Sequence, residues 1–359
     1  MNGSASEKKA KDHPKSRVHQ TTGLKQLAEH LQLDPATVSV VLNDVPGRSI
    51  PQATRDRIKA AAKAMNYQPN LLARSLRSRR TLTIGILVPE LGVGYHAQVM
   101  SAIGDQLIQA GYLYFTAHHR HKQNLIEDYT RMLIGRGAQG LIAIDTRLEH
   151  PVPIPVVAVA GHRQIDGVTN VLLDHARAAE LALGHLYSLG HRKIAFMRGQ
   201  PFSSDSDERW KSLIAVAKRF GLEVKPELVV SLDRDMTSPE PGYPVVQQLL
   251  ASKEPFTAIV AFNDISAIGA IHALREAGRR VPEDVSVVGF DDIQSAAFQN
   301  PALTTVRQPL REMGMIAAET LLRRITAPAK TPYPKEIVVE PELIVRASTV
   351  RLLKAAVLG

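Results

Sequence analysis

The stretch Pro35-Ala36-Thr37-Val38-Ser39-Val40-Val41-Leu42-Asn43 has the pattern of a short helix with two unlike faces. Asp34 precedes it and can cap free backbone N–H groups, and Pro35 suits the first helical position, where its missing donor costs nothing. We expect the helix to end near Asn43. Small and hydroxyl side chains cover one face, and the other face is apolar: Val38, Val41 and Leu42. Such a helix can enter a DNA major groove, although the pattern alone is that of any amphipathic helix.

Apolar residues at helical spacing flank this stretch on both sides. They form one group before it and one after it: Leu24, Leu27, Ala28 and Leu31, then Ile58, Ala61, Ala62 and Met65. With the central helix, these groups predict a three-helix domain over residues 21–66. Residues 1–20 are rich in Lys, Ser and His and too poor in apolar side chains to offset the entropy of ordering, so we expect a disordered basic tail there.

Basic residues gather in the tail and in residues 67–80, and the whole chain has a formal charge of +9. The second segment carries Arg74, Arg77, Arg79 and Arg80 around Leu76, and it is too short to form a stable helix alone in water. A polyanionic partner would explain this clustering, because Lys and Arg neutralise nucleic-acid phosphates. A solvated basic surface is the alternative.

After Arg80, short β-branched runs alternate with amphipathic helices. The predicted strands are Thr83–Val88, Tyr112–Thr116, Leu141–Ile144, Lys193–Met197, Ala258–Ala261 and Val285–Val288. The predicted helices are Gln98–Ala110, Asn124–Arg136, Arg209–Phe220 and Asp264–Ala277. This alternation is typical of βαβ units, in which helices cover a parallel sheet. It occurs twice, so we expect two α/β lobes with a cleft that can hold a small ligand.

Composition argues against several classes of protein. Cysteine is absent, which excludes disulfides, thiolate–zinc sites and cysteine nucleophiles. No apolar run approaches the roughly 20 residues needed to cross a bilayer, and the first twenty residues lack the apolar core of a signal peptide, so we expect a cytoplasmic protein with no membrane partner. An enzyme has little support, because the chain has no Gly-x-Ser-x-Gly elbow, His-Glu-x-x-His motif or phosphate-binding Gly-rich loop.

A series of motifs, in order and nearly in register, resembles the LacI/GalR family of repressors. Up to the first predicted strand, the motifs are Ala28, Ala36-Thr37-Val38-Ser39, Leu42-Asn43, Thr54-Arg55, Asn66-Tyr67, Pro69-Asn70, Ala73-Arg74-Ser75-Leu76 and Ile84-Gly85. Further along they are Leu189-Gly190-His191-Arg192, Arg209, Asn263-Asp264, Gly269-Ala270, Val287-Val288-Gly289-Phe290-Asp291-Asp292 and Leu303-Thr304-Thr305-Val306. The resemblance covers roughly residues 22–347.

The resemblance implies an all-α helix-turn-helix headpiece, a hinge helix over residues 67–80, and an α/β two-lobed periplasmic-binding-protein-like core with parallel sheets. The core would span residues 81–350, with one lobe at about 81–173 and 308–337 and the other at about 174–307 and 338–350. Residues 351–359 would form a short tail. The implied function is a sequence-specific transcription regulator, expected to be a repressor, that needs no cofactor. Its partners would be a palindromic double-stranded DNA operator, a second copy of the chain, and a small-molecule effector, a sugar or sugar derivative.

The resemblance places DNA contacts in the headpiece and hinge, at Thr22, Pro35, Ala36, Thr37, Ser39, Val40, Asn43, Thr54, Asn70, Leu76 and Arg77. Leu76 would be a wedge between base steps with Arg77 as its basic companion, and ordinary linker packing is the alternative. Three headpiece positions depart from the family: Gln32 replaces a turn glycine, Asp34 a serine cap and Val40 a common arginine. Val40 cannot make a bidentate guanine contact and offers only apolar contact, for example to a thymine methyl.

Effector contacts implied by the resemblance fall on Tyr95, His96, Arg209, Asn263, Phe290 and Asp291. These residue types suit a polyol, because an aromatic face stacks on C–H groups while Arg, Asn and Asp pair with hydroxyls. The structural alternatives are a carboxylate that closes a turn for Asp291, a surface ion pair for Arg209, and a helix cap for Asp264. Some sugar-binding relatives have aspartate at the position of Ala160, so either the ligand is not a simple hexose or neighbours compensate, such as His162 or Arg163.

Three histidines, His118, His119 and His121, follow a predicted strand. We expect no metal site there, because they lie in one loop without a carboxylate partner. A solute receptor for transport is a second class of function that the core alone would support. The fused headpiece and the missing signal peptide argue against it.

Overall fold

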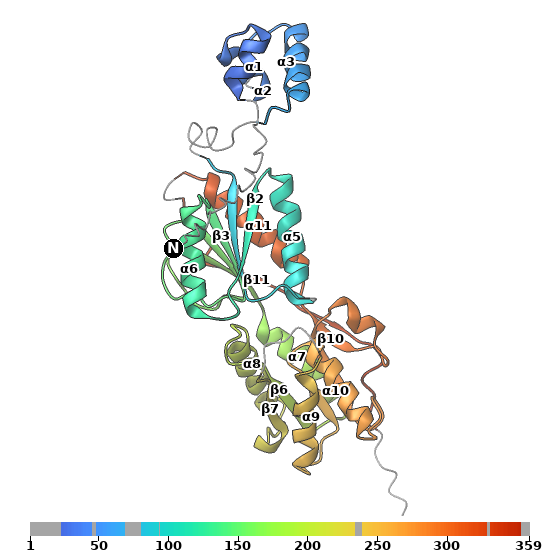
Figure 1. Ribbon diagram of the computed structural model, residues 1–359. Helices are drawn as coiled ribbons and strands as arrows, with labels where there is room; N and C mark the ends of the chain where they lie inside the picture. The colour runs from blue at the N-terminus through green and yellow to red at the C-terminus, as the bar shows by residue number, and fades with distance from the viewer. Residues whose placement is uncertain are drawn as a thin grey trace, which may run out of the picture. The chain divides into compact units, whose positions relative to one another are not determined.

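The computed structural model describes residues 23–44, 48–68, 80–92, 94–233, 239–328 and 331–352. The chain divides into two compact units, Met1–Arg80 and Thr81–Gly359. Within the described residues, the first unit has three short helices, and the second has two sheets with helices on both faces of each (Figure 1).

The first unit packs α1 (Leu24–Leu31), α2 (Pro35–Leu42) and α3 (Gln52–Ala64) around a small apolar core. The buried members of that core are Leu27, Ala28, Leu31, Val38, Val41, Ile58 and Ala62. The predicted all-α headpiece is therefore confirmed.

The turn between α1 and α2 depends on two residues that depart from the family pattern. Gln32 adopts a left-handed conformation with φ of 52°, which glycine adopts without steric cost and most other residues do not. Asp34 caps α2, because its Oδ1 accepts a hydrogen bond of 2.7 Å from the Ala36 amide, and Pro35 occupies the first helical turn. The predicted start of α2 is confirmed.

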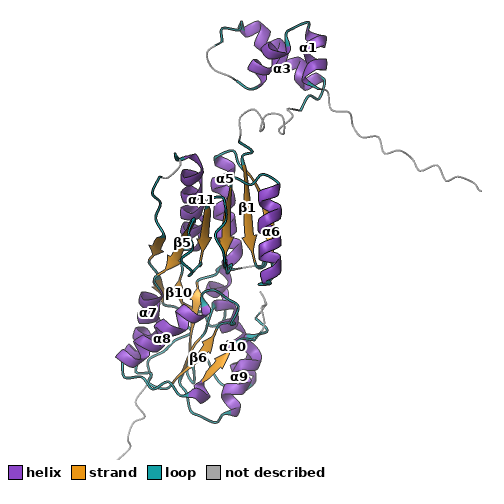
Figure 2. Ribbon diagram, turned by 90° about the vertical axis from the view of Figure 1, so that its left-hand side faces the viewer, coloured by secondary structure: helices purple, strands orange, loops and turns teal. Residues whose placement is uncertain are grey.

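The first lobe of the core is a six-stranded parallel sheet in the order β11-β5-β4-β3-β1-β2. Its strands are β1 (Thr83–Val88), β2 (Leu113–His118), β3 (Gly140–Ile144), β4 (Val156–Val159), β5 (Val168–Leu173) and β11 (Glu336–Val339). Helices α5 (Tyr95–Gln109) and α11 (Leu310–Thr326) pack together on one face, and α6 (Gln123–Gly135) covers the other (Figures 1 and 2).

The second lobe repeats this arrangement in the order β12-β10-β9-β8-β6-β7, with β12 antiparallel to β10. Its strands are β6 (Ile194–Arg198), β7 (Val229–Ser231), β8 (Ala258–Val260), β9 (Ser286–Asp291), β10 (Thr304–Arg307) and β12 (Glu342–Ile344). Helices α7 (His175–Ser188) and α8 (Ser206–Arg219) pair on one face, and α9 (Gly242–Ala251) and α10 (Asp264–Glu276) pair on the other (Figure 2).

The order of strands shows that the chain passes between the lobes more than once. After β5 it enters the second lobe at α7, after β10 it returns through α11 and β11, and it ends the core with β12 in the second sheet. Parallel sheets collect ligands at the carboxyl ends of their strands. The residues that follow β3, β4, β6 and β8 are therefore the natural positions for a site.

Candidate functional site

A cavity of about 90 Å³ lies between the two lobes of the core. Five of the six predicted effector residues line it: Tyr95, His96, Arg209, Asn263 and Asp291. The first two lie in the first turn of α5, while the others come from the second lobe. Segments far apart in sequence thus meet at one place, as the resemblance implies.

Arg209 is a buried residue of α8 rather than a surface ion-pairing residue. Its Nη1 donates to the carbonyl of Phe262, and its Nη2 lies 3.3 Å from Asp205 Oδ2. The guanidinium also stacks on Phe290, 3.7 Å from the ring centre. Phe290 is not among the residues that line the cavity, and its ring packs against Arg209, so its direct contact with an effector stays a prediction.

Asp291 combines an unusual backbone with a buried carboxyl group. It ends β9 with φ of 110°, a region that side chains other than glycine rarely adopt. Burial raises the pKa of its carboxyl group to about 7, against the opposing influence of the Arg209 charge and a 2.6 Å hydrogen bond from Gln308 Nε2. Strained backbone and a buried acid are both unfavourable in the folded state, and such features concentrate at functional sites.

At the start of α10, Asn263 and not Asp264 is the helix cap, which differs from the sequence interpretation. Asn263 is the helix cap, because its Oδ1 accepts from the Ser266 amide at 2.9 Å. Asp264 is the first helical residue, and its carboxyl group accepts from the Ile293 amide and the Thr305 hydroxyl. Asp264 therefore has a structural role, as the alternative interpretation proposed. It does not cap the helix, however, but ties the start of α10 to the segments that contain Ile293 and Thr305.

Asp145, which the sequence analysis missed, directly follows β3 and lines the cavity. Its Oδ1 accepts from the Ser204 amide at 2.9 Å, while its Oδ2 lies 3.8 Å from His96 Nε2 and 4.0 Å from His121 Nε2. Burial raises the pKa of this carboxyl group, but the imidazoles of His96 and His121 and the Ser204 hydroxyl outweigh burial and leave the pKa below its ordinary value. Asp145 therefore brings a buried, ionised acceptor to the cavity.

His121 corrects the expectation that the three loop histidines have no carboxylate partner. It lines the cavity beside Asp145, whereas His119 is buried against the Thr146 hydroxyl at 2.8 Å. The carboxylate partner, Asp145, lies in the loop after β3. Sequence spacing alone could not show that this loop lies near residues 118–121.

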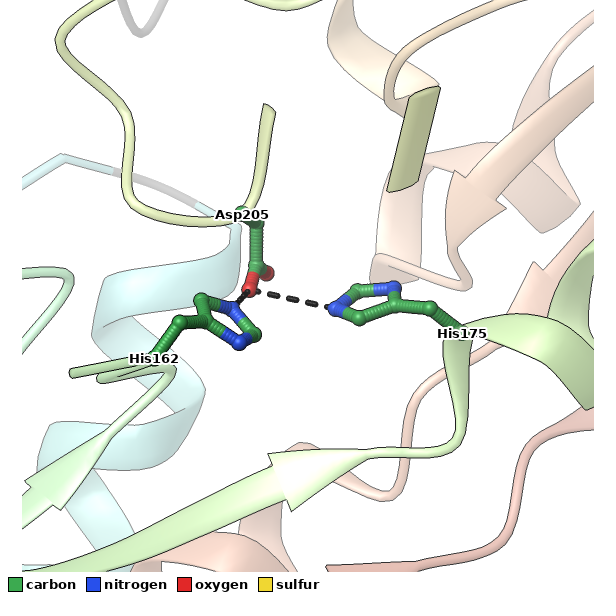
Figure 3. Close-up of side chains that lie close together, drawn as sticks. All are labelled: His162, His175 and Asp205. Carbon is green, nitrogen blue, oxygen red and sulfur yellow. Dashed lines mark hydrogen bonds and ion pairs between the residues drawn. The ribbon is translucent and has the colours of Figure 1, made fainter. Parts of the chain in front are cut away.

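The segment 203–205 of the second lobe reaches across to the first lobe. Besides its amide bond to Asp145, Ser204 places its hydroxyl 2.5 Å from the carbonyl oxygen of Ala160. Asp205 Oδ1 accepts from His162 Nε2 at 2.6 Å and lies 3.3 Å from His175 Nε2 (Figure 3). These contacts hold the two lobes together beside the cavity. We call the residues that make them the interlobe clasp: Asp145, Ala160, His162, Ser204 and Asp205.

The charges within the clasp reinforce one another. Burial raises the pKa of Asp205, but His175 and His162 together bring it well below its usual range. Burial lowers the pKa of His162, and its hydrogen bond to Asp205 reverses that effect and leaves the pKa raised. Neither His162 nor Arg163, the two neighbours suggested to compensate for Ala160, is among the residues that line the cavity, because His162 bonds to Asp205 and exposed Arg163 lies 3.9 Å from Glu149.

His162, His175 and Asp205 are also the described residues that could hold a metal ion, because their donor atoms lie within 4.8 Å of one another. Two ligands of a tetrahedral zinc ion with bonds of about 2.1 Å stand roughly 3.4 Å apart. The 2.6 Å separation of His162 Nε2 from Asp205 Oδ1 is hydrogen-bond geometry instead. Arg209 adds a positive charge beside the Asp205 carboxylate. We therefore interpret His162, His175 and Asp205 as a hydrogen-bonded cluster and not as a metal site.

Several buried polar atoms at the cavity have no hydrogen-bond partner within the described part of the chain. They are Tyr95 Oη, His96 Nε2 and Arg209 Nε. Burial and the charges of Asp205 and Asp145 raise the pKa of Tyr95 well above its usual value, so its hydroxyl is a neutral donor. Unpaired buried polar groups are costly, and a polar ligand would satisfy them.

In the headpiece, the predicted DNA-contacting residues that the structure describes lie on α2 and at the start of α3. Pro35, Ala36 and Asn43 are exposed, Thr37, Ser39 and Val40 are half-buried, and Thr54 lies in the first turn of α3. Thr22, Asn70, Leu76 and Arg77 fall outside the described residues. No helix among those the structure describes is long and apolar enough to span a bilayer.

Comparison with known proteins agrees with both units. Residues 33–70 match the family of bacterial regulatory proteins described as lacI family, and residues 183–349 match the periplasmic binding protein-like domain. The HTH-type transcriptional repressor PurR of Erwinia tasmaniensis is 33% identical over 334 residues, which cover 90% of this chain and 96% of that protein. The chain belongs to the LacI family. It is a DNA-binding transcription regulator and not an enzyme.

Solved structures of LacI-family proteins share this fold. The lac repressor dimer bound to operator and the anti-inducer ONPF is 25% identical, with a TM-score of 0.82, and the match covers 92% of this chain and 100% of that one. The complex of the transcriptional regulator CelR with cellobiose is 28% identical, with a TM-score of 0.66 and coverage of 91% and 99%. A LacI-family regulator from Enterococcus faecium with bound ribose is 26% identical, with a TM-score of 0.66 and coverage of 76% and 100%.

Proposed function

We propose that this LacI-family protein is a cytoplasmic repressor that binds a palindromic operator as a homodimer and responds to an uncharged polyol bound in the interlobe cavity. The observation that carries the effector proposal is the set of buried polar atoms without a hydrogen bond on Tyr95 and Arg209, together with His96, which has only a 3.8 Å ion-pair contact with the carboxylate of Asp145. A polyol offers donors and acceptors on each hydroxyl and can satisfy all of them. The relatives named as repressors support that direction of control.

The charges around the cavity favour a neutral ligand over a phosphorylated one. Among the described residues that line it, Asp145, Asp205 and Asp291 are acidic, and Arg209 is the sole Lys or Arg. Both terminal nitrogens of Arg209 already have partners. A phosphate group would therefore meet carboxylates with only the Nε of Arg209 left as a guanidinium donor, and like charges at short range are costly in a poorly solvated site. The bound cellobiose and ribose of the two relatives also support a sugar.

The dimer proposal is based on an exposed apolar patch at one edge of the first lobe. Strand β2 ends the sheet, and the described chain places no further strand beside it. The large exposed apolar side chains there are Ile108 on α5, Leu113 and Phe115 on β2, and Met132 on α6. We assign this β2 patch to a second copy of the chain, because a two-fold operator needs two headpieces and the lac repressor was solved as a dimer on its operator.

A ligand screen with an operator-binding readout tests the effector. Purified protein is screened by thermal shift with neutral sugars, the same sugars as phosphate esters, and nucleosides. A ligand at 100 times its Kd stabilises the folded state by about 2.7 kcal/mol. We expect a neutral sugar to raise Tm and to change operator affinity, since an effector must bind the DNA-competent and incompetent states unequally.

Two variants connect this response to the cavity. Asp145→Asn removes the charge at the cavity and keeps the shape, so it should weaken the effector response at least about tenfold and leave operator binding near normal. Asp284→Asn, on the exposed loop before β9, is the matched control and should respond like the parent. A phosphorylated sugar or a nucleoside as the strongest ligand would contradict the neutral-polyol proposal.

A further inference from the structure

The outer face of α2 has no long polar side chain. Between Pro35 and Asn43, all of which the structure describes, no Arg, Lys or Gln occurs, and the exposed or half-exposed residues are Pro35, Ala36, Thr37, Ser39, Val40, Leu42 and Asn43. Val38 and Val41 are buried and Leu42 packs against the headpiece core. Val40 is half-exposed and does not belong to that core. The face that remains free presents methyl groups and two hydroxyls.

Asn43 is the one amide on this face, and it is already engaged. Its Nδ2 donates to the Ser39 carbonyl at 2.7 Å and lies 3.3 Å from Ser39 Oγ. The Ser39 carbonyl also accepts from the Asn43 backbone amide at 3.1 Å, so both the amide and the side chain of Asn43 are tied to the last turn of α2. A bidentate contact from Asn43 to adenine would require the amide to leave this position.

Base edges in the major groove are distinguished by a few pairings. Arg or Lys pairs with guanine, Asn or Gln with adenine, and an apolar side chain contacts the 5-methyl group of thymine. Arg and Lys are missing from the free face of α2, and its one amide, Asn43, is already hydrogen-bonded within the helix. Apolar side chains are available there in Ala36 and Val40.

We propose that α2 reads its operator mainly through thymine methyl groups, with Val40 and Ala36 as the specificity-determining side chains. This inference rests on the DNA-binding function of the family and on α2 as the helix that enters the groove. It implies that each half-site presents thymines to α2 and that guanine–cytosine pairs there are not recognised by hydrogen bonds from the helix. Affinity must then depend strongly on phosphate contacts and on the remaining parts of the chain.

The test removes single methyl groups from the DNA. The full-length protein first selects its operator from random duplexes, and each thymine of the selected site is then replaced singly by uracil, which lacks only the 5-methyl group. We expect about a fourfold loss of affinity where a buried methyl contact is deleted, and more than tenfold when both half-sites are changed. Thymines outside the half-sites are the control and should tolerate uracil.

Variants of α2 identify the side chain that makes the contact. Val40→Ala should abolish the effect of uracil at one position per half-site, whereas Val338→Ala, on exposed strand β11, should leave the uracil profile unchanged. Because the uracil scan uses the unmodified protein, it remains decisive if Val40→Ala fails to fold.

The opposite pattern overturns the proposal. If uracil is tolerated throughout, and 7-deazaguanine or 7-deazaadenine in the half-site lowers affinity instead, recognition runs through hydrogen bonds at N7. Such bonds would require Asn43, Thr37 or Ser39 to turn toward the bases. If neither set of replacements has an effect while the site is still selected, α2 is not the reading element, and the family's DNA-binding function stands without it.

Discussion

Two of the three acidic residues of the cavity show how hydrogen-bond and charge partners decide the pKa of a buried carboxyl group. Asp145 and Asp291 are both poorly accessible, and burial alone raises the pKa of each. Asp145 gains the imidazoles of His96 and His121 and the donors of Ser204, which outweigh burial, whereas the partners of Asp291 do not. One site therefore holds a stable anion and a group that titrates near neutrality, which is typical of sites tuned for a ligand.

Asp291→Asn should stabilise the protein at neutral and alkaline pH. The folded pKa of Asp291, about 7, lies above the unfolded value of 3.8, so the folded chain binds more protons between these values and loses stability as pH rises through that window. The full difference corresponds to roughly 4 kcal/mol as an upper bound. Asparagine can keep the bond from Gln308, so denaturant unfolding should show the variant more stable at pH 8, with the gap closing below about pH 4.

An exposed acid with the opposite shift provides the control for this measurement. Hydrogen bonds from the Arg280 side chain and amide hold the pKa of Asp284 at about 2. Its stabilising effect is present above the unfolded pKa of 3.8 and disappears as pH falls toward 2, so Asp284→Asn should not stabilise the protein at pH 8. A gain of equal size in both variants would mean that net charge, and not the burial of Asp291, is responsible.

Five of the six predicted effector residues line the cavity, and sequence could single them out because the family motifs hold each at a fixed place along the chain. Asp145 also carried a usable signal, since it directly follows the predicted strand Leu141–Ile144, and ligands gather at such strand ends. Asp205 carried none, and His162 was singled out only as a neighbour of Ala160. Their contact depends on how two lobes with separate cores dock, and no local pattern encodes that geometry.

At the scale of elements, some helices and strands were predicted well and others were not predicted. Strand β1 has the predicted bounds, and α10 begins at the predicted Asp264. The sequence analysis missed the helices α7, α9 and α11 and the strands β4, β5, β10 and β11, as well as β7 and β12 with three residues each. The predicted hinge helix over 67–80 falls largely outside the described residues and stays a prediction.

Two substitutions of Asp34, the residue that caps α2, should affect the stability of the headpiece and its affinity for DNA differently. Asp34→Ala removes the acceptor for the Ala36 amide and should destabilise the headpiece by about 1 kcal/mol, seen as faster hydrogen exchange of the α2 amides in the full chain. Asp34→Asn keeps the cap and removes a negative charge next to the DNA phosphates. It should therefore keep exchange slow and tighten operator binding. Equal effects of both variants on stability would rule out the capping role.

Leu76 is predicted to act as a wedge that kinks the operator. Its replacement by alanine should reduce both affinity and bending by removing the side chain that unstacks a central base step, with a loss on the order of 1–3 kcal/mol. Non-specific binding should persist with a strong salt dependence, because Arg74, Arg77, Arg79 and Arg80 remain. A gel-shift and bending assay on the selected operator measures both quantities. An unchanged bend would indicate that Leu76 only packs within the linker.

At the scale of the whole molecule, the β2 patch connects the fold to assembly. Phe115→Glu places a charge in the patch, so light scattering at micromolar concentration should show monomers, and operator affinity should fall by at least about tenfold, because a monomer contacts one half-site. Val338→Glu, an exposed apolar residue on the opposite edge strand β11, is the matched control and should stay dimeric. A dimer that survives Phe115→Glu would locate the interface elsewhere.

One backbone amide of the interlobe clasp can report, through hydrogen exchange, how often the lobes separate. The amide hydrogen of Ser204 belongs to the second lobe and is bound by the Asp145 carboxylate of the first, at 2.9 Å. Solvent deuterium can replace that hydrogen only while the two lobes are apart, so its exchange rate reports the separation of the lobes. Amides within β8 stay bonded inside one lobe and exchange only when that lobe unfolds. When reclosing is fast, the Ser204 exchange rate divided by the rate of an unprotected amide is the fraction of molecules whose cavity is open without a ligand, and the β8 amides show how much of that exchange comes from unfolding.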